Sequence, residues 1–272
     1  MTVFTAACVQ MSATPDVEAD IAHALEAMEQ AADRGATLIA LPEYCAGLDV
    51  VDGALAPVAF AEAAHPALDA FAGFARDRGV GVLIGSIAVS KGGCLFNRSF
   101  HVGADGAVRA RYDKIHMFDI DLGANGRYCE SEVVTPGTRA VLTETHGTVA
   151  GMSICYDLRF AHLYRDYAKA GAGILLIPAA FTRKTGETHW HVLQRARAIE
   201  TGTFVIAPGQ CGTVAGGSEM FGHSLIVDPW GRVLADAGTG PGLCLAEIET
   251  SLVAEVRAKI PALQNDRDYS GV

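Results

Sequence analysis

The chain has 272 residues, half of them hydrophobic, and its 31 acidic and 21 basic residues give a net charge of −10. This hydrophobic content can form a large buried core, but the longest apolar runs, VGVLIG and GILLIPAAF, are far too short to span a bilayer. The acidic balance makes nucleic acid and anionic membrane surfaces poor partners, because both are polyanions.

The first half of the chain predicts alternating strands and helices. A strand in TVFTAACVQM follows no basic segment, so we do not interpret it as a signal peptide. Thr14-Pro15-Asp16 is typical of a helix that has Thr14 as its N-cap, and the helix is expected to stop at Gly35. ATLIALPE predicts a buried strand and residues 66–78 a helix. The strands GVGVLIGSIAVS and CLFNRSFHVG flank a tight turn.

The same order of elements recurs in the second half. GTVAGMSICYD predicts a strand, residues 160–169 a helix, GILLIP a strand and residues 187–200 a longer helix. The strands TFVIAPGQC, HSLIVDP, RVLADAG and GLCLAEIE follow, with a last helix near residues 252–259. AADRGATLIALPE and YAKAGAGILLIPA share a helix end, a glycine, an apolar strand and a proline. We therefore predict two similar halves, which begin near Val3 and near Thr148.

Continuous apolar strands between helices predict an α/β fold whose sheets are covered on both faces. This patterning leaves two arrangements open. The halves could lie side by side in one sheet, or they could stack sheet on sheet with helices outside. No linker rich in serine and proline separates the halves, so we expect a single domain over residues 1–272.

Seven cysteines are spread widely along the chain, and no two of them form a CxxC pair. An odd and dispersed set indicates a reducing, cytoplasmic setting rather than a disulfide framework. His189 and His191 lie two apart on an expected helix and so point in different directions. We therefore expect no metal site and no cofactor.

Three reactive side chains lie at or beyond the ends of predicted strands, where the sites of parallel sheets gather. Glu43 follows LIALP, Lys114 lies in RYDKIHMFD, and Cys155 follows GMSI. Taken singly, they could be a solvated carboxylate, a surface charge and a core thiol. Together they could perform acyl transfer. The carboxylate could take the thiol proton, the thiolate could attack a carbonyl carbon, and the ammonium could stabilise the oxyanion.

A strand-to-helix turn at Cys155 would also direct the backbone N–H of Tyr156 at the oxyanion. This geometry is analogous to a nucleophile elbow, although the G-x-S-x-G spacing is absent. A Cys–His pair is the competing interpretation. Its candidates are His162 on the predicted helix and His223 at a strand start, and the sequence favours neither.

LPEY, YDKIHMFDID and CYDLRF resemble, in order and spacing, the three signature segments of the nitrilase superfamily, the carbon–nitrogen hydrolases. HWHVLQRARAIET, GQCG and GHSLIVDPWG extend the likeness along the chain and are most similar to the Nit branch, which holds ω-amidases and deaminated-glutathione amidases. The resemblance implies a four-layer α-β-β-α sandwich with its two sheets face to face. It also implies that Cys155 is the nucleophile, Glu43 the general base and Lys114 the oxyanion stabiliser. Glu130 in YCESE would be a second active-site glutamate that orients Lys114.

The activity implied is that of a thiol-dependent amidase, with a thioester on Cys155 and no metal or cofactor. The best expectation for the substrate is a small anionic ω-amide, deaminated glutathione first and α-ketoglutaramate next. Such a substrate needs a cation besides Lys114, and Arg159 and Arg183 are candidates, unless Arg159 pairs with Asp157 and Arg183 is solvated. The resemblance further implies a homodimer or higher homo-oligomer. We expect its interface to include the segment after the nucleophile and the C-terminal tail from residue 261.

The sequence departs from the family pattern at three places. Ala161 stands where proline is usual, Ala179 stands where this branch usually has serine, and the tail QNDRDY lacks the usual basic pair. Ala179 is expected near the substrate pocket, so a hydrolase acting on a nitrile or on an N-carbamoyl amino acid stays an alternative. A non-catalytic binding protein on this fold should lack one of the three reactive residues, and all three are present.

Overall fold

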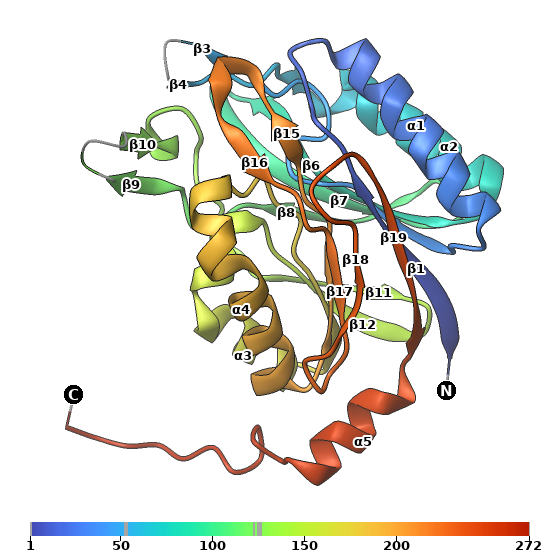
Figure 1. Cartoon of the computed structure of the whole chain (residues 1–272), viewed down its shortest axis with the longest axis vertical. Helices are drawn as coiled ribbons and strands as arrows, with labels where there is room; N and C mark the ends of the chain where they lie inside the picture. The colour runs from blue at the N-terminus through green and yellow to red at the C-terminus, as the bar shows by residue number, and fades with distance from the viewer. Residues whose placement is uncertain (1, 52–53, 122, 124–126, 272) are drawn as a thin grey trace.

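The computed structural model describes residues 2–51, 54–121, 123 and 127–271. Two sheets lie face to face, and helices cover the outer face of each, as Figure 1 shows. Helices α1 (Val17–Asp33) and α2 (Pro66–Arg78) pack on one sheet, and α3 (Ala161–Lys169) and α4 (Arg183–Thr201) pack on the other. The two halves therefore stack in the four-layer α-β-β-α sandwich that the resemblance implied.

The first sheet has the strand order β19-β1-β2-β6-β7-β8, and a short strand β5 pairs with β6. Strands β1, β2 and β6 run parallel, and β5 is parallel to β6. Strand β19 pairs antiparallel with β1, β7 with β6, and β8 with β7. The strands span β1 Val3–Gln10, β2 Leu38–Ala40, β5 Phe60–Ala61, β6 Gly81–Lys91, β7 Cys94–Val102, β8 Val108–Asp113 and β19 Gly242–Glu249.

The second sheet repeats this plan with the order β11-β12-β13-β14-β17-β18. Its central strands β12, β13 and β14 are parallel. The strands span β11 Val141–Thr145, β12 Thr148–Met152, β13 Ala172–Leu176, β14 Phe204–Ala207, β17 Leu225–Val227 and β18 Val233–Asp236. The prediction of two similar halves of strand and helix is thus confirmed.

Three small hairpins and one further helix complete the described elements. The hairpins lie at one end of the sandwich, and helix α5 (Ser251–Lys259) lies at the other (Figure 1). The hairpin strands are β3 Val50–Val51, β4 Ala54–Leu55, β9 Asp119–Asp121, β10 Arg127–Cys129, β15 Cys211–Thr213 and β16 Glu219–Phe221. None of the described helices has both the length and the apolar character that a membrane crossing requires.

Alternation along β1 divides the core into two layers. Phe4, Ala6 and Cys8 belong to a buried cluster shared with the second sheet and helices α3 and α4. Ala7 and Val9 belong to a cluster shared with α1 and α2. Successive side chains of a strand point to opposite faces, so a strand buried on both sides is apolar throughout. This explains why the sequence pattern of β1 is a continuous run.

The helix starts depart from the predictions at two places. The N-cap of α1 is Asp16, whose carboxylate accepts from the Ala19 N–H, so the prediction of Thr14 is wrong. Thr14 instead donates its N–H and hydroxyl to the buried carboxylate of Asp20. Helix α4 begins at Arg183, four residues earlier than predicted. It includes Gly186, where a β-carbon would lie 2.3 Å from the Phe221 ring, so only glycine allows this close packing.

Candidate active site

Three turns at one end of the sandwich bring the predicted reactive residues together. Glu43 follows β2, Lys114 follows β8, and Cys155 begins a 3₁₀ turn just after β12. All three are buried, with exposures of 2% for Glu43 and Lys114 and 6% for Cys155. They also line one cavity of about 300 Å³. The fold therefore brings these three distant segments together at one cavity.

Lys114 lies between two carboxylates. Its Nζ donates to Glu43 Oε1 at 3.0 Å and to Glu130 Oε2 at 2.7 Å. Burial by itself would lower the pKa of Lys114, but the two carboxylates outweigh it and hold the pKa well above its usual value. Lys114 is therefore an ammonium that is fixed in place and partly neutralised by its neighbours.

Glu43 is held at both carboxylate oxygens. Oε1 accepts from Asn97 Nδ2 at 2.9 Å as well as from Lys114, and Oε2 accepts from the Ala180 N–H at 2.7 Å. Asn97 lies on β7 and Ala180 follows β13, so both sheets position this one side chain. Such fixed hydrogen bonds leave the carboxylate little freedom to reorient.

Glu130 completes the charged group around Lys114. It starts a 3₁₀ turn, and its Oε2 also accepts from the Phe118 N–H at 2.7 Å. The hydroxyl of Tyr44 lies 3.5 Å from Glu130 Oε1. Burial and the Glu130 charge raise the pKa of Tyr44, so its phenol stays protonated and able to donate. The neighbouring Glu132 is exposed, with 67% of its side-chain surface open to solvent.

Cys155 adopts a left-handed backbone conformation, with φ of +48°. Such a conformation costs a residue with a side chain about 1–3 kcal/mol, and it is held here by the hydrogen bond from the Cys155 N–H to Pro178 O at 2.8 Å. The strained turn after β12 matches the elbow-like geometry predicted from the sequence. Tyr156 follows directly and lines the same cavity.

The thiol of Cys155 is protonated in the resting site. Burial raises its pKa well above the usual value, and the charge of Glu43 and a hydrogen bond to Glu43 add to this rise. Lys114 lowers the pKa but does not outweigh these effects. From the sequence, a cation and a base were expected beside the thiol. The structure indicates that the cation, Lys114, is not sufficient to make Cys155 a thiolate. A base must therefore take the proton, and the Glu43 carboxylate lines the same cavity.

Asp157 is a buried residue that sequence reasoning did not assign to the site. Its carboxylate accepts from the Ile154 N–H at 2.9 Å, and so holds the turn that carries Cys155. It also accepts from Tyr112 Oη at 2.6 Å and from the His116 N–H at 3.0 Å, on the segment that carries Lys114. Asp157 therefore connects the two segments. It is not paired with Arg159, the alternative that the sequence left open.

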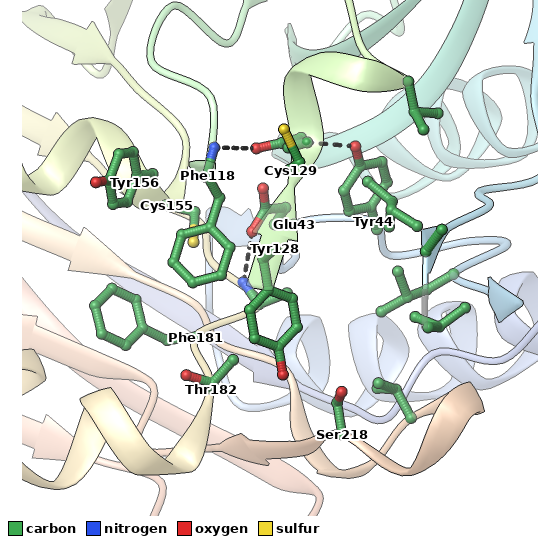
Figure 2. A pocket seen from close by; sticks show the side chains of 18 of the residues that line it. Glu43, Tyr44, Phe118, Tyr128, Cys129, Cys155, Tyr156, Phe181, Thr182 and Ser218 are labelled. Atoms are coloured by element: carbon green, nitrogen blue, oxygen red, sulfur yellow. Dashed lines mark hydrogen bonds between the residues drawn. The ribbon is translucent and has the colours of Figure 1, made fainter. Parts of the chain in front are cut away.

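Aromatic side chains surround the rest of the cavity. Figure 2 shows Tyr44, Phe118, Tyr128 and Phe181 around the carboxylate of Glu43 and the sulfur of Cys155. Strand β10 and the 3₁₀ turn that begins at Glu130 supply one wall. Strand β16 supplies part of another wall through Met220. A cavity of this size, with a few charged groups among apolar walls, is typical of a small-molecule site.

Of the two arginines predicted to contact substrate, Arg159 lies beside the cavity and Arg183 lies away from its described lining. The Arg159 guanidinium bonds to His189 Nδ1 at 3.2 Å and lies over the rings of Tyr156 and Phe181, which line the cavity. Arg183 is exposed and pairs with Glu187 and Glu219, and the structure does not bring it to the described lining of the cavity.

Arg127 does line the cavity, and sequence reasoning missed it. Its side chain is 69% exposed and lies 3.7 Å from Glu132. It belongs to none of the motifs, so no local signal marked it. Ala179, expected near the pocket, is buried in the core, while Ala180 beside it lines the cavity.

The fold and this site define a class of enzyme. The carbon–nitrogen hydrolase family model matches residues 5–258, and the chain belongs to that family. It is 37% identical to the deaminated glutathione amidase of Synechocystis, over 97% of this chain and 98% of that protein. It is 33% identical to human omega-amidase NIT2, over 98% of this chain and 96% of that protein.

Solved structures show the same architecture. The NitFhit protein of C. elegans superimposes with a TM-score of 0.90 at 31% identity, over 98% of this chain. This chain spans 66% of that protein's length. Nit3 of Saccharomyces cerevisiae superimposes with a TM-score of 0.82 at 26% identity, over 96% of this chain and 95% of Nit3.

Proposed function

We propose that the protein is a thiol-dependent amidase that hydrolyses a small anionic ω-amide through a thioester on Cys155. The observation that carries this proposal is the burial of Cys155, Glu43 and Lys114 at one cavity, with Lys114 Nζ donating to Glu43 Oε1 at 3.0 Å. Nucleophile, base and cation thus meet at one cavity. No step requires a metal or a cofactor.

The proposed cycle has two halves. Glu43 takes the thiol proton, and the sulfur attacks the amide carbonyl carbon. The oxyanion that forms is stabilised by Lys114 Nζ and the Tyr156 N–H. The C–N bond breaks as the leaving nitrogen receives the proton from Glu43, so ammonia or an amine departs and a thioester remains. Glu43 then takes a proton from water, whose oxygen attacks the thioester, and the acid and the free thiol are released.

Deaminated glutathione is the first candidate substrate, with α-ketoglutaramate second. The named relatives support this choice, since two of them are a deaminated glutathione amidase and an omega-amidase. A substrate carboxylate requires a cation other than Lys114. Arg159 is the better of the two predicted candidates, because it stands directly behind the aromatic wall of the cavity, while Arg183 is committed to two glutamates.

The test is a comparison of kcat/KM for deaminated glutathione, α-ketoglutaramate and a neutral amide of similar size. One well-placed charged hydrogen bond should favour the anions by roughly 2–4 kcal/mol, or about thirtyfold to nearly a thousandfold. Arg127→Gln should reduce this preference most, because Arg127 lines the cavity, and Arg159→Gln less, because Arg159 stands behind its wall. Arg183→Gln serves as the matched control. Equal rates on the neutral amide would rule out an anionic pocket. A preference for an N-carbamoyl amino acid or a nitrile would favour the alternative hydrolases.

We also propose a homodimer or higher homo-oligomer in the cytoplasm. The seven cysteines are all free, which suits a reducing compartment. Apolar side chains of Ile199, Trp230 and Ile260 are about half exposed around a groove beside α5. An apolar surface of this kind is typical of a contact between subunits.

A further inference from the structure

A cluster of two histidines and one aspartate lies outside the cavity. His191 is on α4, His223 lies between β16 and β17, and Asp236 ends β18. His191 Nε2 lies 3.0 Å from Asp236 Oδ2, and His223 Nδ1 lies 2.9 Å from Asp236 Oδ1. In the part of the chain that the structure describes, this is the one group of three potential ligands whose donor atoms all lie within 4.8 Å of one another.

The cluster comes from segments that are far apart in the sequence. The pair considered from the sequence, His189 and His191, does diverge, since His189 bonds to Arg159 and His191 to Asp236. The fold instead groups His191 with His223 and Asp236, which it brings next to the His191 side chain of α4. Spacing along the sequence does not reveal this cluster, because its three residues come together only in the folded chain.

The backbone holds two of the three side chains in place. His223 has a left-handed conformation, with φ of +52°, and its N–H donates to Gly238 O at 2.6 Å. Asp236 Oδ1 accepts from the Gly238 N–H at 2.8 Å. The His223 ring also stacks on Phe221, with 4.5 Å between ring centroids. Backbone strain and fixed orientation of this kind recur where side chains must point at a ligand.

Solvent reaches the cluster from one side. The side chains of His191, His223 and Asp236 are 35%, 23% and 31% exposed, so they are partly covered but accessible. An ion could therefore enter from water and keep water as a further ligand. Two imidazoles and one carboxylate with an open position form a ligand set that suits Zn²⁺.

We propose that His191, His223 and Asp236 form a binding site for Zn²⁺ or a similar divalent transition metal. Ligand atoms around tetrahedral zinc, each about 2.0–2.2 Å from the metal, lie about 3.3–3.5 Å apart. His191 Nε2 and His223 Nδ1 each lie 3.0 Å from the same oxygen, Asp236 Oδ2, which is within a few tenths of an ångström of this arrangement. On binding, the two N–H···O contacts are replaced by three bonds to the metal, one from each residue, and the proton of each ligating ring nitrogen moves to the other ring nitrogen or to water.

The metal would link three elements that surround one wall of the cavity. It would join α4, β18 and the connection that follows β16, and Met220 of β16 lines the cavity. The Phe221 N–H also donates to Phe181 O at 2.8 Å, next to the cavity. The proposed site is thus structural, and its metal does not reach the reacting atoms.

The test is a calorimetric titration of the full chain with Zn²⁺ alone. Accessible thiols also bind zinc, so the titrated protein should carry Cys94→Ser, Cys129→Ser and Cys155→Ala. We expect saturable binding of one Zn²⁺ per chain. His191→Gln and Asp236→Asn should each weaken it at least about tenfold. His23→Gln, which removes an exposed histidine on α1, is the matched control and should leave the affinity unchanged.

A second measurement covers the case in which a ligand variant fails to fold. Crystals of the same thiol-depleted protein soaked in Zn²⁺ should give an anomalous difference peak between His191, His223 and Asp236. Thermal unfolding without metal reports whether each variant is folded. The proposal is overturned by the absence of saturable binding, by equal affinity in His191→Gln, Asp236→Asn and the unsubstituted background, or by an anomalous peak only elsewhere.

Discussion

At the scale of single residues, the proposed reaction depends on one shared carboxylate. Glu43 shares the cavity with the Cys155 thiol and accepts a hydrogen bond from the Lys114 ammonium. Because burial and Glu43 keep the thiol protonated, proton transfer to Glu43 has to accompany the attack on substrate. The second carboxylate, Glu130, keeps Lys114 in place when Glu43 becomes neutral.

Glu43→Gln and Lys114→Ala should each lower kcat by at least about two to three orders of magnitude, because one removes the base and the other an oxyanion donor. The double variant should lose far less than the product of the single effects, since the groups act as a unit. Steady-state kinetics of the four proteins measures this. Glu26→Gln, at an exposed residue of α1 away from the cavity, is the control. Multiplicative losses would argue against one shared site.

At the scale of elements, the turns around the sheets position the chemistry. Asp157 connects the turn of Cys155 to the segment of Lys114 through buried hydrogen bonds with Tyr112, His116 and Ile154. Asp157 is fully buried, so water cannot take the place of its carboxylate as the acceptor for these donors.

Asp157→Asn should lower both stability and kcat, because an amide can replace only part of the accepting capacity of a carboxylate. Leaving one buried donor unsatisfied costs about 1–3 kcal/mol. Urea unfolding and steady-state kinetics of the same preparations would measure the two effects. Asp77→Asn, at an exposed residue of α2, should change neither. A stable variant with normal kcat would show that the connection does not position the nucleophile.

The elements also show what the sequence could and could not predict. The bounds of α2 were predicted correctly, because its apolar face has helical spacing and Pro66 stands at its first position. The structure adds that Gly79 caps its end with a left-handed φ of +66°. The start of α4 was missed, because Gly186 is a poor helix former and only its tertiary contact with Phe221 explains it. Arg127 and the His191 cluster depend on chain reversals that no local pattern encodes.

At the scale of the whole molecule, the site was predictable because it lies where strands end. The carboxyl ends of β2 and β12 place Glu43 and Cys155 at the same end of two stacked sheets. Patterning predicted the strands, but whether the sheets extend or stack depends on inter-sheet packing. In the sequence analysis, the stacked arrangement was predicted from the resemblance to the nitrilase superfamily and not from the strand pattern.

The protein should be at least a dimer at micromolar concentration. Light scattering should report a mass of twice 28.5 kDa or more. Trp230→Asp should shift the mass toward the monomer, because a charge would be buried in the apolar contact around the groove. Val51→Asp, at an exposed valine of β3 at the opposite end of the sandwich from α5 (Figure 1), is the control. A species of 28.5 kDa alone for the unsubstituted protein would refute the proposal.

The central claim is that Cys155 forms a covalent acyl intermediate. Rapid-quench mass spectrometry of the intact protein during turnover tests it most directly, and a peptide digest locates the adduct. We expect an increase by the mass of the acyl group on Cys155, and neither adduct nor turnover in a folded Cys155→Ala variant. Normal turnover by Cys155→Ala, or an acyl group on another residue, would contradict the account.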